Sequence, residues 1–75
     1  MSKKIEQQIL DTLGIKAYLV RQAGLYRVQP DAEENPEFAV WDAQRQHTHL
    51  PTPVEAALAF ADRLGRFELE RQAAA

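Results

Sequence analysis

The chain has 75 residues, no cysteine and a formal net charge of −2. This length allows one small domain, which we expect to span residues 1–75 with frayed ends at 1–2 and 71–75. The lack of cysteine excludes disulfides and thiolate metal sites, and the slight acidity argues against nucleic-acid binding by bulk electrostatics. No segment reaches the roughly 18 apolar residues of a membrane helix, and residues 5–8 (IEQQ) are too polar for a signal peptide. We therefore expect a cytoplasmic protein with no membrane partner.

The first predicted helix covers residues 2–13. Ser2 is an acceptable N-cap, and Gly14 is a suitable terminator. The apolar residues recur on one side of this helix: Ile5, Ile9, Leu10 and Leu13. At about three turns, the helix would be marginal alone, so it must pack against another element.

A hairpin is predicted next. Residues 15–21 (IKAYLVR) are rich in the β-branched and aromatic residues of strands, and residues 25–29 (LYRVQ) would return antiparallel. Between them, residues 22–24 form a tight turn in which Gly24 can take a positive φ. Residues 30–36 (PDAEENP) are predicted to form a loop, because two prolines enclose acidic and turn-forming residues.

Residues 38–43 are predicted to form a third strand. Phe38 and Val40 would point to one side and Ala39 and Trp41 to the other, so both faces of the strand would be partly covered. Residues 44–46 can turn, and residues 47–50 are predicted to return as a short fourth strand.

The second predicted helix begins with a capping box. Thr52 is the N-cap and Glu55 lies three residues later, while Pro53 occupies the first helical position. We expect the Thr52 hydroxyl to accept from the Glu55 amide and the Glu55 carboxylate to reach the Thr52 amide. The apolar residues follow helical spacing: Val54, Ala57, Leu58, Ala61 and Leu64. Gly65 can end the helix, which leaves residues 66–70 open as a short strand or more helix.

The predicted fold class is α+β, with the order α-β-β-β(-β)-α. A small antiparallel sheet of three to four strands would carry both helices packed on one face. Its other face would be partly exposed, and together with the thin core this predicts a homodimer through the open face or an edge strand.

The histidines were considered as metal ligands. His47 and His49 would share one face of a strand, and Asp42 across a hairpin would be a third ligand. The interpretation we favour is two polar side chains on the solvent face, so no metal site is predicted.

No catalytic arrangement is predicted either. The chain lacks a cysteine nucleophile and a glycine-rich phosphate loop, and Thr52 already serves as a cap. Glu33 and Glu34 lie on a solvated loop that gives no reason for a raised pKa. We therefore expect no enzymatic activity and no cofactor.

Candidate partner-binding residues are aromatic or acidic. Aromatic side chains dominate binding hot spots, although Trp41 is also a natural core residue. Acidic side chains gather in the loop and could dock on a basic surface or, with Glu68 and Glu70, mimic a phosphate backbone. The partner-binding prediction comprises Tyr18, Tyr26, Trp41, Asp31, Glu33, Glu34 and Glu37.

One resemblance supports a different function. The segments 26–28 (YRV), 38–41 (FAVW) and 50–56 (LPTPVEA) are similar in order to arm-type DNA-binding domains of phage integrases and to AP2-like domains, over residues 25–64. That resemblance implies a sheet that enters the major groove with basic residues. The overall order α-β-β-β-α also resembles that of double-stranded-RNA-binding domains. The alternative prediction is therefore a DNA-binding domain that uses Arg21, Arg27 and Arg45.

The leading prediction is a small non-enzymatic protein-binding module. Arginine outnumbers lysine and alanine is abundant, which is typical of GC-rich bacterial genomes. In size, acidity and lack of catalytic residues the chain resembles phage and mobile-element inhibitors of host machinery, anti-CRISPR proteins among them. The expected function is inhibition or regulation of a host protein or nucleoprotein complex.

Overall fold

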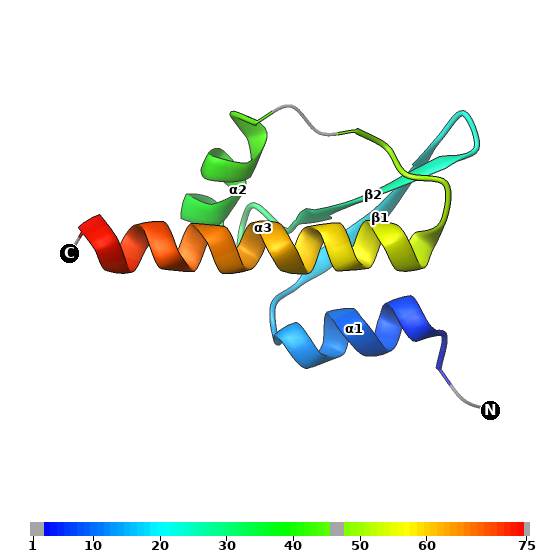
Figure 1. Cartoon of the computed structure of the whole chain (residues 1–75), viewed down its shortest axis with the longest axis horizontal. Helices are drawn as coiled ribbons and strands as arrows, with labels where there is room; N and C mark the ends of the chain where they lie inside the picture. The colour runs from blue at the N-terminus through cyan, green and yellow to red at the C-terminus, as the bar shows by residue number, and fades with distance from the viewer. Residues whose placement is uncertain (1–2, 46–47, 75) are drawn as a thin grey trace.

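The computed structural model describes residues 3–45 and 48–74. The elements are α1 (Ile5–Leu13), β1 (Ala17–Gln22), β2 (Leu25–Pro30), α2 (Pro36–Ala43) and α3 (Pro53–Ala74). Helix α3 runs along the whole molecule, with α1 on one side of it and α2 on the other (Figure 1). The predicted α+β class is confirmed. The described residues form three helices and a two-stranded antiparallel sheet, instead of two helices and three to four strands.

Within the two described ranges, no helix combines the length and the apolar character needed to cross a membrane. Residues 71–74 belong to the last turn of α3, whereas residues 1–2 and 75 lie outside the described residues. The frayed ends therefore stay a prediction.

Helix α1 ends as predicted but begins later. Gly14 adopts the left-handed conformation, with φ of 72°, which a glycine tolerates without steric cost. The N-cap is Lys4, whose backbone is extended and whose carbonyl accepts from the Gln8 amide at 3.1 Å. Ser2, the predicted N-cap, lies outside the described residues.

The predicted hairpin is confirmed. Six consecutive pairs join β1 and β2, from Ala17 with Pro30 to Gln22 with Leu25. The turn residues Ala23 and Gly24 have φ of 53° and 77°. Positive φ at both central residues matches the right-handed twist of the strands and therefore favours a two-residue hairpin turn.

The predicted third strand is wrong, because residues 38–43 belong to α2. Pro36 stands in its first turn, where its φ already suits a helix and its missing donor costs nothing. Phe38 and Asp42, four residues apart, are both buried, whereas Val40 is 60% exposed. A short apolar run such as FAVW is compatible with a buried strand or with a helix. Here the segment is a helix, which buries Phe38 and leaves Val40 exposed.

The predicted fourth strand is reduced to one bridge. The Tyr26 amide donates to the Leu50 carbonyl and the Leu50 amide to the Tyr26 carbonyl, each at 2.7 Å. Residues 48 and 49 precede this bridge without strand structure, and His47 lies outside the described residues. This bridge lies along the outer side of β2.

The capping box of α3 is confirmed in part. The Thr52 hydroxyl accepts from the Glu55 amide at 3.2 Å, but the Glu55 carboxylate accepts from that hydroxyl at 3.1 Å instead of from the Thr52 amide. Gly65 does not end the helix, so residues 66–70 are helical. Phe67 explains this, since it continues the buried stripe of Phe60 and Leu64 and packs on α2.

Helix α3 supplies most of the core. Phe60 and Val28 are fully buried, so the centre lies where α3 crosses β2. Leu10 of α1 and Phe38 of α2 close the core from two sides. Helices α1 and α2 lie on different sides of α3 (Figure 1). Each of them therefore forms its own surface region together with its neighbours.

Candidate functional site

A buried ion cluster joins β2, α2 and α3. Asp42 is only 1% exposed. Arg63 Nε donates to Asp42 Oδ1 at 2.7 Å, and Arg63 Nη2 donates to the Val28 carbonyl at 2.6 Å. Arg27 Nη2 lies 3.6 Å from Asp42 Oδ2. Arg27 is thus partly buried, with 22% of its side chain exposed, and its charge is paired within the fold.

Trp41 is held by a second polar cluster on the surface. The Arg45 guanidinium lies 3.4 Å from the centre of the Trp41 ring, and Arg45 Nη1 donates to the Trp41 carbonyl at 2.6 Å. The indole Nε1 donates to Glu70 at 3.0 Å, and Glu70 lies 3.5 Å from Arg45. The indole therefore already has a polar partner, and Arg45 covers its ring.

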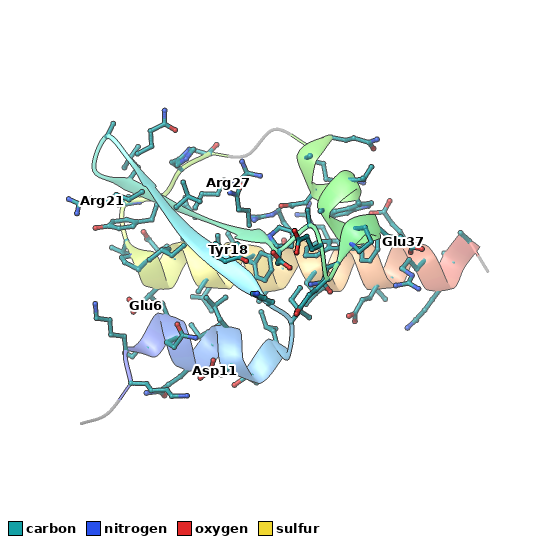
Figure 2. The ribbon with its side chains drawn as sticks, turned by 180° about the vertical axis from the view of Figure 1, so that it is seen from behind. Glu6, Asp11, Tyr18, Arg21, Arg27 and Glu37 are labelled. Carbon is teal, nitrogen blue, oxygen red and sulfur yellow. The ribbon has the colours of Figure 1, made fainter. Side chains whose placement is uncertain are left out.

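The three arginines of the DNA-binding alternative are not brought together. Arg21 pairs with Tyr26 across the hairpin, and its guanidinium lies 5.8 Å from the Tyr26 ring centre. Arg27 is one residue beyond Tyr26 and so points to the other face of the sheet. Figure 2 shows Arg21 near the hairpin turn and Arg27 closer to the middle of the molecule. Arg45 is engaged at the end of α2.

Tyr18 and Asp31 bind each other. The Tyr18 hydroxyl donates to Asp31 Oδ1 at 2.8 Å, and Asp31 Oδ2 accepts from the Glu34 amide at 3.1 Å. The hydrogen bond to Asp31 raises the pKa of Tyr18, because deprotonation would place two negative charges together. The same bond lowers the pKa of Asp31 by stabilising its carboxylate. Asp31 therefore orders the loop, while the Tyr18 ring remains 46% exposed.

This pair should make stability depend on pH at both extremes. The Asp31 contribution is present above its ordinary pKa of 3.8 and is lost as the pH falls through the lower folded value. The Tyr18 contribution is present below its ordinary pKa of 10.0 and is lost as the pH rises through the higher folded value. Urea midpoints of wild type and Tyr18→Phe should differ at neutral pH and converge at both ends. A difference that stays constant across both ends would contradict this coupling.

An open cleft of about 350 Å³ lies between α2, α3, the loop before α2 and the residue Ile15 before β1. Ile15, Phe38, Leu64 and Phe67 form its apolar floor. The carboxylates of Glu34, Glu37 and Glu68 form its rim. Two of the predicted acidic residues are thus brought together, and Glu68 joins them because α3 continues past Gly65. Glu33 is exposed but does not line this cleft.

Arg71 lies in the same cleft. Its guanidinium is 5.4 Å from the centre of the Phe67 ring, and Nη2 is 3.9 Å from Glu37 Oε2. A cation over an aromatic face beside a carboxylate is a favourable arrangement. Sequence reasoning missed Arg71 and the buried position of Asp42, since the spacing that exposes one and buries the other appears only when residues 36–43 and 66–74 are both read as helices.

The remaining predicted residues have structural roles. Tyr26 is half-buried against the core and carries the bridge to Leu50. Asp42, considered as a ligand with the histidines, is paired with Arg63. Within residues 3–45 and 48–74, no three side chains of histidine, cysteine, aspartate or glutamate are grouped so that they could hold a metal ion. The acidic cleft combines apolar and acidic side chains from three segments of the chain. No family model matches the chain, and searches of the curated proteins and of the solved structures found no match.

Proposed function

We propose that this chain is a non-enzymatic, cytoplasmic protein-binding module, of the type by which phages and mobile elements inhibit or regulate a host protein. The acidic cleft would receive a basic side chain of the partner. The observation that carries the proposal is the grouping of Glu34, Glu37 and Glu68 around the aromatic floor made by Phe38 and Phe67.

The floor and rim suit a lysine or arginine side chain. The alkyl part of such a side chain packs on apolar surface while its charged head stays at the polar edge. Phe38 and Phe67 are themselves 3% and 8% exposed, so the apolar contact would be small and the rim charges would govern recognition. Complementary charge of this kind contributes more to specificity and association rate than to affinity.

Arg71 supports the same chemistry from within the molecule. Its contacts with Phe67 and Glu37 are those that we propose for the partner's side chain. Both Arg71 and Glu37 are exposed, at 62% and 77%, so their ion pair is weak and the guanidinium can be displaced. A partner would thus replace an internal contact without exposing a buried charge.

Charge reversal of the rim tests this proposal. The triple variant Glu34→Lys, Glu37→Lys, Glu68→Lys should lose the partner that the tagged wild-type protein retains from nuclease-treated bacterial lysate. Once that partner is identified, its affinity should fall at least tenfold, because each reversal places like charges together. Glu33→Lys is the matched control, since it lies on the same loop outside the cleft. Full retention by the folded triple variant, or capture that nuclease abolishes, would contradict the proposal.

A further inference from the structure

The outer edge of β1 exposes a regular series of backbone groups. Tyr26 directs its amide and carbonyl away from β1, toward Leu50. Its partner in the register is Arg21, which therefore directs its own groups away from β2. The alternation of an antiparallel ladder gives Leu19 and Ala17 the same orientation. These three residues make no backbone hydrogen bond with any other segment of the described chain.

The two edges of the hairpin differ in how they are covered. Along β2, Leu50 bonds Tyr26, and Arg63 bonds the Val28 carbonyl. Along β1, the six pairs run without a bulge, and the segment AYLVRQ contains no proline and one charge. Tyr18 and Leu19 are 46% and 42% exposed. Bulges and prolines are two of the usual protections of an edge strand, and β1 has neither, while its one charge is Arg21.

Helix α1 leaves room beside this edge. Helix α3 packs on β2, and α1 packs on α3. A cleft of about 360 Å³ opens between α1 and β1, and Leu10, Ala17 and Leu19 form its apolar wall.

The charges near the hairpin end of the edge are mainly basic. Lys3 and Lys4 line the cleft, and Arg21 stands at the hairpin end of the exposed edge. Glu6 lines the same cleft, and Asp11 binds Lys3 at 2.6 Å. At the other end of the edge, Lys16 interacts with Asp31 and Glu34. An extended segment with acidic residues at the end beside Arg21 would complement this distribution.

We propose that the outer edge of β1 binds an extended apolar segment of a partner protein, with acidic residues at the end that lies beside Arg21, and that this segment adds to the sheet as a third strand beside α1. Main-chain hydrogen bonds to Ala17, Leu19 and Arg21 would supply affinity, and the apolar cleft would select alternate side chains. This surface is separate from the acidic cleft of α2 and α3, so either proposal can fail without the other.

A synthetic peptide tests the proposal on the wild-type protein. Its centre alternates valine and threonine, and two aspartates stand at one end. Binding should protect the amides of Ala17, Leu19 and Arg21 from hydrogen exchange. N-methylation of alternate peptide amides blocks one edge of the peptide at a time, so one methylated form should lose at least tenfold in affinity and the other should bind. Equal binding by both methylated forms, or no binding of the parent peptide, would overturn the proposal.

A backbone substitution in β1 tests the same bonds from the protein side. Leu19→Pro removes the outward amide donor without removing a bond to β2, because the Leu19 and Val28 pair is not hydrogen-bonded. It should weaken the peptide at least tenfold, whereas Leu19→Ala truncates the side chain but keeps the donor and should retain more binding. If Leu19→Pro fails to fold, the methylated peptides decide. A wild-type dimer in sedimentation that Leu19→Pro converts to monomer, with no peptide bound by either, would assign the edge to a second copy and overturn the proposal.

Discussion

Replacing Asp42 with alanine is expected to destabilise the protein by about 3 kcal/mol or more, because removing one partner leaves buried charge uncompensated. Asp42 is 1% exposed, and both of its arginine partners are largely covered, with exposed side-chain fractions of 22% for Arg27 and 13% for Arg63. Marginal small domains have only about 5–15 kcal/mol of stability, so much of this protein should unfold in mild denaturant. Urea denaturation followed by circular dichroism measures the loss.

Asp62→Ala is the matched control for this substitution. Asp62 is 63% exposed and pairs with Arg66 one helical turn away, so its loss should cost no more than about 0.5 kcal/mol. A second test removes the arginine that donates to the carboxylate. In an Arg63→Met background, Asp42→Ala should lower the free energy of unfolding less than in the wild type. One of the two arginine charges that Asp42→Ala leaves uncompensated is already absent in that background. Equal losses from Asp42→Ala and Asp62→Ala would show that the buried cluster contributes no more than a surface pair.

Local features of the sequence predicted the parts of the fold that local interactions determine. The hairpin, the stop at Gly14 and the start of α3 at Thr52 each depend on a few neighbouring residues with defined backbone preferences. The prediction for residues 38–43 was wrong for the opposite reason. Their apolar run is compatible with either period, and contacts with Phe60 and Phe67, distant in sequence, favour the helix. Pro36, just before this run, is a local feature that favours the start of a helix.

The buried ion cluster and the acidic cleft were harder to predict because both depend on that misassigned segment. Read as a strand, residues 38–43 would place Asp42 near the histidines and Arg27 on an open sheet face. As a helix, the segment turns Asp42 inward, where it engages Arg27 and Arg63. It also places Glu37 beside Glu68 at one cleft. Residues of the acidic loop were named as candidates from the sequence, and their grouping with Glu68 of α3 depends on the tertiary structure.

Helix α2 thus connects the two clusters and the acidic cleft. Its buried side makes the ion cluster through Asp42 and the aromatic contacts through Phe38, while Trp41 binds Glu70. Because α2 has only eight residues, it would be unstable alone and depends on these contacts with α3. A substitution that weakens the packing of α2 on α3 should therefore also disturb the acidic cleft.

Phe38→Ala should be the most damaging apolar substitution in α2, at about 3–5 kcal/mol. The Phe38 ring is 3% exposed and its centre lies 5.1 Å from Phe67, 5.6 Å from Phe60 and 5.9 Å from Trp41. Val40→Ala in the same helix should change stability by about 0.5 kcal/mol or less, since Val40 is 60% exposed. Denaturant unfolding compares the two, and hydrogen exchange of the α2 amides reports whether the helix detaches from α3 before global unfolding. If Phe38→Ala cost no more than Val40→Ala, the aromatic contacts would not be what holds α2, and the acidic cleft would lose its structural basis.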